Sequence, residues 1–144
     1  MATIHPTAVI GNGVKMDDGT EIEKEVKIGD DCVLGRKVLI EKKSVIGSRV
    51  TIGEGSVIEK KSNVGNDCFL GNKVVVERHV VIGKGVKIGD DVVLEKYTKV
   101  LDDVDISTGS ILSDGNTFSD GISIRYLFLS LREKINFFVS KIPG

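Results

Sequence analysis

Residues 26–31 and residues 86–91 have the same six-letter sequence, VKIGDD. In this stretch an apolar residue directly precedes a glycine, and the arrangement recurs along the chain with a period of six. Every sixth residue from Ile4 to Ile124 is apolar, and the residue two positions earlier is mostly small or β-branched. Two inward-facing positions separated by one outward-facing position describe a strand of about three residues. The sequence therefore predicts a long series of very short strands.

The glycines follow the same period. Sixteen of the 17 glycines lie either one or three residues after an apolar position of the series, and only Gly144 does not. A residue type confined to two phases indicates a turn that recurs with one backbone geometry, through a positive φ or a close approach of stacked backbone. A six-residue period fits neither an α-helix nor a heptad coiled coil. We therefore expect an all-β solenoid.

A longer period of 18 residues is superposed on the first. Five glutamates recur at this spacing, and each is followed by a basic residue: Glu23, Glu41, Glu59, Glu77 and Glu95, with Lys24, Lys42, Lys60, Arg78 and Lys96. Three six-residue sides therefore make one coil. Stacked carboxylates repel one another, and we expect the adjoining basic column to neutralise them in a structural corner.

One outward-facing stripe of the predicted solenoid is apolar throughout. The residue before the periodic apolar position is hydrophobic in five successive coils on the same side, at Leu39, Val57, Val75, Val93 and Ile111. Contiguous exposed apolar surface usually marks a contact. We interpret this stripe as an interface.

With its VKIGDD repeats, the chain resembles the hexapeptide-repeat transferase-like family, whose pattern is an aliphatic residue, a glycine and three or four variable positions. The resemblance covers residues 2–118 without an insertion. It implies a left-handed parallel β-helix of about six to seven triangular coils, commonly assembled as a homotrimer. It also implies an acetyl-CoA- or acyl-CoA-dependent transferase that acts on a hydroxyl or amine of a sugar or nucleotide-sugar, with a histidine as general base.

The last segment has a different character and is predicted to be a second unit. Residues 119–144 hold most of the aromatic residues, and a C-terminal amphipathic α-helix is expected there, capping or packing on the prism of residues 1–118. Its apolar face includes Leu127, Leu131 and Phe138, which we add to the predicted interface. Docking on the same subunit, on a neighbouring subunit or at a membrane interface remains open. Charged residues interrupt the apolar run, so a transmembrane span is not expected.

Composition excludes several other classes. The chain of 144 residues has a net charge of −1, which argues against a general nucleic-acid surface. Cys32 and Cys68 lie on inward positions two coils apart, about 9.6 Å, beyond the reach of a disulfide. We expect them to be small buried residues. The N-terminus has no secretory signal, so a cytoplasmic location is expected.

Candidate catalytic residues are few, because the chain has two histidines. His79 lies at an exposed corner in the middle of the prism and is the candidate general base, with an ordinary solvated corner residue as the alternative. His5 lies in the first coil and is interpreted as structural. The two histidines are four coils apart, so no metal site is expected.

Two functions therefore stand side by side. The first is the transferase, with acetyl-CoA or acyl-CoA as co-substrate and no bound cofactor. The second is a non-catalytic trimeric scaffold or part of a larger assembly, favoured by uninterrupted coils and by the lack of a substrate loop. Fold alone does not choose between them.

Overall fold

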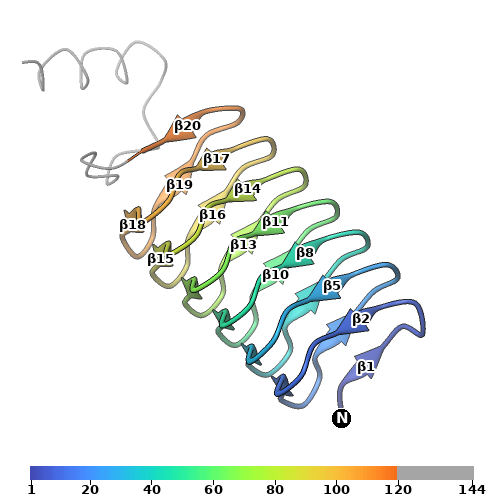
Figure 1. The fold of residues 1–144 in the computed structure, drawn as a ribbon. Helices are drawn as coiled ribbons and strands as arrows, with labels where there is room; N and C mark the ends of the chain where they lie inside the picture. Colours follow the sequence, from blue (N-terminus) through green and yellow to red (C-terminus); the bar gives the residue numbers. More distant parts are fainter. Residues whose placement is uncertain (120–144) are drawn as a thin grey trace, which may run out of the picture.

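A computed structural model describes residues 1–119 as one parallel β-solenoid (Figure 1). The solenoid has twenty strands of two residues each, arranged in three sheets. Residues 120–144, which contain the expected C-terminal helix with Leu127, Leu131 and Phe138, lie outside the described residues. The domain boundary at 118/119 therefore stays a prediction.

Each coil contributes one strand to each of the three sheets, so sequential strands never pair with each other. The first sheet contains β1 (Thr3–Ile4), β4 (Glu21–Ile22), β7 (Leu39–Ile40), β10 (Val57–Ile58), β13 (Val75–Val76), β16 (Val93–Leu94) and β19 (Ile111–Leu112). The second sheet contains β2 (Val9–Ile10), β5 (Lys27–Ile28), β8 (Val45–Ile46), β11 (Asn63–Val64), β14 (Val81–Ile82), β17 (Lys99–Val100) and β20 (Thr117–Phe118). The third sheet contains β3 (Lys15–Met16), β6 (Val33–Leu34), β9 (Thr51–Ile52), β12 (Phe69–Leu70), β15 (Lys87–Ile88) and β18 (Asp105–Ile106).

The register confirms the 18-residue coil. In the first sheet Val57 lies opposite Leu39 on one side and Val75 on the other. The strands are one residue shorter than expected, because the first inward position of each side precedes the strand. Its side chain still faces the core, as Val74 and Val76 are both fully buried. Aliphatic side chains at these two positions fill the prism.

The corners explain both glycine phases. From Gly13 to Gly115, every residue three positions after the periodic apolar residue has a positive φ, and these residues include lysines, aspartates, His79 and Tyr97 as well as glycines. Where a glycine directly follows the apolar residue, it is required for a different reason, which is lack of space for a Cβ. A Cβ added at Gly29 would lie 2.5 Å from Ser48 Oγ and 2.7 Å from the Ser48 backbone nitrogen. The next coil approaches too closely for any side chain there.

Candidate active site

The apolar stripe predicted from the sequence forms one column on the outer surface of the first sheet. Leu39, Val57, Val75, Val93 and Ile111 are aligned in register on successive strands, and each is half-buried. Glu21 and Thr3 occupy the equivalent positions nearer the N-terminus. We call these five residues the apolar column. The interface role assigned to it stays a prediction.

The corner that joins the first sheet to the second carries His79. We call this edge the first corner. His79 is half-buried, and its ring stacks on that of Tyr97 with a centroid distance of 4.9 Å and an interplanar angle of 1°. The backbone N–H of each donates to a carbonyl of the preceding coil, His79 to Lys60 and Tyr97 to Arg78, both at 3.2 Å. Stacking therefore fixes the plane of the imidazole at the rim of the apolar column, four residues after Val75.

Tyr97 was missed by the sequence reasoning, although the signal was present. It follows His79 by 18 residues, one coil, and therefore occupies the same corner position one step further along the solenoid. Stacked equal positions bring side chains into contact in a parallel sheet. His79 and Tyr97 both have the positive φ that recurs at this corner, 60° and 63°. Their backbone conformation is therefore a property of the solenoid and is not specific to these two residues.

The glutamates of the first corner do not pair with the adjoining bases as expected. Each carboxylate instead accepts a hydrogen bond from a backbone N–H of the next coil, as in Glu23 Oε1 from Lys42 and Glu77 Oε1 from Lys96, both at 3.0 Å. No side-chain nitrogen of a Lys or Arg lies within 4.0 Å of these five carboxylates in the described part of the chain. The carboxylates therefore form no ion pair with the bases that follow them, and the ladder is a backbone cap; charge compensation at longer range stays a prediction.

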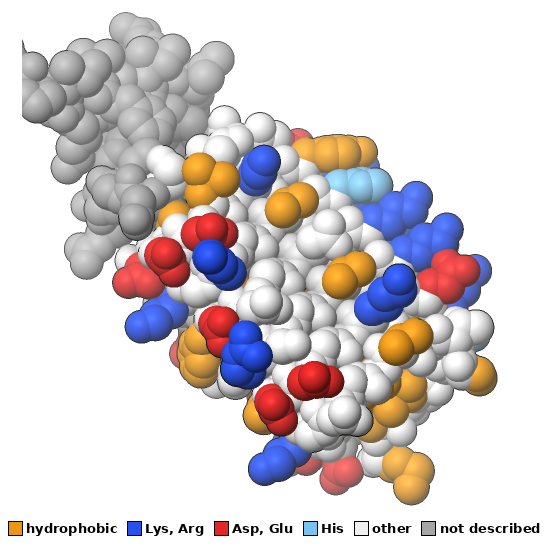
Figure 2. Space-filling view, viewed as in Figure 1, with side chains coloured by type: hydrophobic (Ala, Val, Ile, Leu, Met, Phe, Trp, Pro, Cys, Tyr) orange, Lys and Arg blue, Asp and Glu red, His pale blue; other side chains and the backbone are white. Residues whose placement is uncertain are grey.

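Burial within this ladder affects its central member. Glu59 has a pKa raised above its ordinary value, first because burial disfavours the charged form and then because Glu41 and Glu77 lie on either side. Of the five basic residues that follow these glutamates, Lys96 has its Nζ 3.9 Å from an Asp114 carboxylate oxygen, and the other four have no carboxylate within 4.0 Å among the described residues. Figure 2 shows Lys and Arg side chains gathered beside a histidine along one edge of the molecule.

The second histidine lies far from the first. His5 is exposed, its Nδ1 lies 2.8 Å from Thr7 Oγ1, and it lines an open hollow of about 440 Å³ with Glu21, Glu23, Lys24 and Lys42. The structure therefore does not bring His5 and His79 together. Residues 1–119 also contain no group of three His, Cys, Asp or Glu side chains placed to hold a metal ion.

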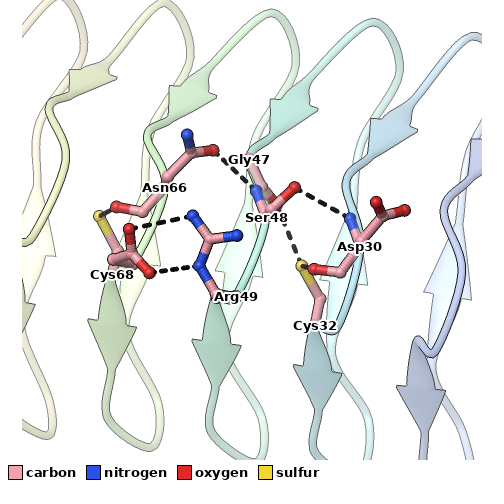
Figure 3. A network of polar contacts seen from close by, with 8 residues as sticks. Asp30, Cys32, Gly47, Ser48, Arg49, Asn66 and Cys68 are labelled. Atoms are coloured by element: carbon pink, nitrogen blue, oxygen red, sulfur yellow. Dashed lines mark hydrogen bonds and ion pairs between the residues drawn. The ribbon is translucent and has the colours of Figure 1, made fainter.

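The corner between the second and third sheets is a structural network (Figure 3). Asp30 N–H donates to Ser48 Oγ at 3.1 Å, and Ser48 N–H donates to Asn66 Oδ1 at 2.8 Å. On the surface beside them, Arg49 makes two hydrogen bonds to Asp67, at 2.6 and 3.2 Å. The Arg49 guanidinium holds the pKa of the Asp67 carboxyl below its usual range. These contacts hold one coil to the next, and we assign the corner a structural role.

Both cysteines are free and buried, as expected, and each thiol also has a hydrogen-bond partner. Cys32 Sγ donates to the Gly47 carbonyl, and Cys68 Sγ donates to the Gly83 carbonyl, both at 3.0 Å. Burial raises the pKa of each thiol. The protonated thiol is a poor nucleophile, so neither cysteine is a candidate catalytic residue.

The described residues include no helix with the length and apolar character needed to cross a bilayer.

Comparison with solved structures identifies the fold. The acetyltransferase domain of PglB from Neisseria gonorrhoeae FA1090 is 18% identical, with a TM-score of 0.65, and the match covers 82% of this chain and 51% of that one. The same domain in complex with acetyl coenzyme A matches equally well. The UDP-N-acetylglucosamine acyltransferase of Francisella novicida is 15% identical, with a TM-score of 0.64, over 81% of this chain and 60% of that one.

LpxA from Bacteroides fragilis 9343, a UDP-N-acetylglucosamine acyltransferase, is 19% identical over 99% of this chain and 77% of its own, with a TM-score of 0.53. These likenesses show the fold, a left-handed parallel β-helix of the hexapeptide-repeat type. The chain spans about half the length of the PglB domain. No curated protein is significantly similar to it in sequence.

A family model described as the GMPPB C-terminal domain matches residues 1–79. This match includes the apolar residues Leu39, Val57 and Val75 and ends at His79. Because it covers more than half of the 144 residues, the chain belongs to the GMPPB C-terminal domain family.

Proposed function

We propose that the protein transfers an acetyl or acyl group from a coenzyme A thioester to a hydroxyl or amine of a sugar or nucleotide-sugar, with His79 as general base. The observation that carries this proposal is the imidazole of His79, held by stacking on Tyr97 at the rim of the apolar column. The PglB domain, solved with acetyl coenzyme A, and the UDP-N-acetylglucosamine acyltransferases share the fold and support the reaction class.

The homotrimer belongs to the same proposal, as does the cytoplasmic location. If the apolar column packs against a neighbouring subunit, that subunit lies next to the first corner, and His79 faces the groove between the two. Lys60, Arg78 and Lys96 line the same corner in successive coils. Their cationic side chains suit the phosphates of a coenzyme A thioester.

The chemical step needs one base at this position. The neutral imidazole of His79 takes a proton from the acceptor hydroxyl or amine, and the acceptor oxygen or nitrogen forms a bond to the thioester carbonyl carbon. The carbon–sulfur bond then breaks, and the departing thiolate takes that proton from the imidazolium. No net proton is gained or lost by the protein.

The test compares two variants at equivalent corner positions. His79→Ala removes the imidazole, whereas Lys61→Ala changes the residue one coil earlier, which has nearly the same φ, 57° against 60°. With acetyl-CoA and a panel of amino sugars and nucleotide amino sugars, thiol release should fall by about 100-fold or more in His79→Ala, the usual contribution of a general base. Lys61→Ala should keep most of its activity.

Equal turnover in His79→Ala and the parent protein would remove His79 from the mechanism. A calorimetric titration of the full chain with acetyl-CoA tests the donor separately. The absence of binding heat at millimolar acetyl-CoA would contradict the transferase proposal.

The second candidate function is a non-catalytic trimeric scaffold. Two observations favour it. From Thr3 to Phe118 the strands recur at a constant spacing without an inserted loop. In addition, no side chain among the described residues hydrogen-bonds to the imidazole of His79 to fix its tautomer. A trimer that binds no acetyl-CoA would support this second function.

A further inference from the structure

The aromatic stack of the first corner ends on an open ring face. One face of Tyr97 lies on His79, and the equivalent position in the following coil is Gly115, which has no side chain. A Cβ added at Gly115 would meet no atom of the described residues within 4 Å. Tyr97 is accordingly 55% exposed. Among residues 1–119 nothing occupies the next place in the stack, over the exposed ring of Tyr97.

Two lysines flank this surface. Lys96 directly precedes Tyr97, and its Nζ lies 3.9 Å from an Asp114 carboxylate oxygen. Lys99, on the outer surface of β17, is exposed and has no carboxylate within 4.0 Å in the part of the chain that the structure describes. The surface therefore combines a flat π-system with two lysines, of which Lys96 is paired with Asp114 and Lys99 has no carboxylate partner among residues 1–119.

We propose that the free face of Tyr97 binds the base of a nucleoside phosphate, with the phosphate contacted by Lys99 and Lys96. A planar base extends the stack at the height of Gly115, where a side chain would otherwise lie. Stacking on an aromatic ring tolerates any nucleobase, because every nucleobase has a π-face. The lysine ammonium groups favour an anionic ligand such as a phosphate. The site shares Tyr97 and Lys96 with the proposed transferase and to that extent rests on the proposed function, but it is tested by nucleotide binding and not by turnover.

The same chemistry occurs in a free nucleotide and in the nucleotide portion of a larger molecule such as coenzyme A. The experiment therefore uses AMP, coenzyme A without an acyl group, and ribose 5-phosphate, which lacks the base. Binding to the full chain is measured by calorimetry and by saturation-transfer NMR on the base protons. We expect AMP and coenzyme A to bind and ribose 5-phosphate to bind at least 10-fold more weakly.

Four variants locate the site. Tyr97→Leu removes the π-face and Tyr97→Phe keeps it. Gly115→His places an imidazole over Tyr97, and Gly109→His makes the same change at another corner of the same coil, where φ is also positive and an added Cβ also meets nothing within 4 Å. Tyr97→Leu and Gly115→His should each weaken AMP binding about 10-fold or more. Tyr97→Phe and Gly109→His should leave it unchanged.

The role of the cation is tested in the same titration. Lys99→Gln should weaken AMP binding and reduce its dependence on salt, whereas Lys27→Gln, at the equivalent position of β5, should do neither. If coenzyme A binds more tightly than AMP and responds to the same variants, the natural source is a larger nucleotide derivative. Equal affinities favour a free nucleotide.

The proposal is overturned if AMP does not bind, or if it binds equally well to Tyr97→Leu and Gly115→His. These outcomes differ from a failure of the transferase proposal, which is a loss of turnover or of acyl-CoA binding judged on His79 and the donor. A parent protein that turns over acetyl-CoA but does not bind AMP would disprove the nucleotide site alone.

Discussion

At the scale of single residues, the small polar side chains of the core complete the corners. Ser62 is fully buried, and its Oγ donates to the Glu77 carbonyl at 2.7 Å while accepting the Val80 N–H at 3.2 Å. Cys32 and Thr20 make the equivalent bond to the carbonyl fifteen residues later. Within residues 1–119 no buried side-chain nitrogen or oxygen lacks a partner. The core thus admits hydroxyls and thiols at positions where they donate to a corner carbonyl.

Replacing Ser62 by alanine should therefore destabilise the solenoid. The change leaves the buried Val80 N–H without its acceptor and the part-buried Glu77 carbonyl without its side-chain donor. An unsatisfied buried group costs about 1–3 kcal/mol. Ser62→Cys should cost distinctly less, because Cys32 and Cys68 already donate from equivalent positions. Urea denaturation gives the midpoints. Equal midpoints for Ser62→Ala and the parent protein would mean that this bond contributes nothing to stability.

The sequence predicts where such residues lie but not what they bind. The six-residue period placed Cys32, Cys68 and the inward serines on one phase, and their burial followed from it. Their partners depend on the corner carbonyl of the next coil, and this carbonyl is located only when the corner geometry is known. For the same reason the sequence does not predict the stack of His79 on Tyr97. The 18-residue period predicts that the two side chains are neighbours, but it does not predict the orientation of their rings.

At the scale of elements, the glutamate ladder of the first corner is a cap that runs along the prism. Each carboxylate accepts a hydrogen bond from a backbone N–H at the turn that has no partner in the parallel sheet. The Arg78 N–H, for example, donates to Glu59 Oε1 at 3.2 Å. At the other two corners short side chains of the following coil accept the equivalent N–H, for example Asp90 from Asn72 at 2.8 Å. The glutamate carboxylate accepts from the following coil, whereas the aspartate carboxylate accepts from the preceding coil. This difference explains why glutamate replaces glycine directly after the periodic apolar residue at this corner alone.

Neutralising the central carboxylate of the ladder should stabilise the fold at neutral pH. The pKa of Glu59 is raised in the folded protein, so the folded state binds its proton more tightly than the unfolded state does. Folding stability therefore falls as pH rises from the unfolded pKa through the folded pKa. Glu59→Gln keeps an oxygen for the Arg78 N–H and removes the repulsion from Glu41 and Glu77. Urea midpoints should be higher for Glu59→Gln at pH 7 and nearly equal at pH 3.5.

The matched control is Glu23→Gln, which changes an exposed carboxylate at the N-terminal end of the same ladder. It has a carboxylate neighbour in the ladder on one side only, at Glu41. We expect a smaller gain at pH 7 from this substitution. A midpoint that falls in Glu59→Gln at pH 7 would show that attraction to Arg78 outweighs burial and repulsion.

At the scale of the whole molecule, the three outer faces of the prism differ in a way that a single coil cannot reveal. The second sheet alternates apolar and polar outward residues, with Lys27, Val45 and Asn63 on consecutive strands. The first sheet carries the apolar column without interruption over five coils. The sequence predicted this difference because the register is constant. The sequence could not predict what covers the apolar column, because this depends on the surface of whatever packs against the first sheet and not on the repeat.

The proposed homotrimer makes the apolar column its contact, and one substitution on each of two faces tests this. Val75→Lys puts a charge in the middle of the column, where burial against a neighbouring subunit would leave the charge without solvent. Val81→Lys makes the same change on the outer face of the second sheet, where Val81 lies between Asn63 and Lys99. Lysine already occurs among the outward-facing residues of that sheet. Light scattering should give three times the chain mass of 15.5 kDa for the parent and for Val81→Lys, and a much lower mass for Val75→Lys. A trimer that survives Val75→Lys, or a parent protein that is monomeric, would contradict the assignment of this face as the subunit interface.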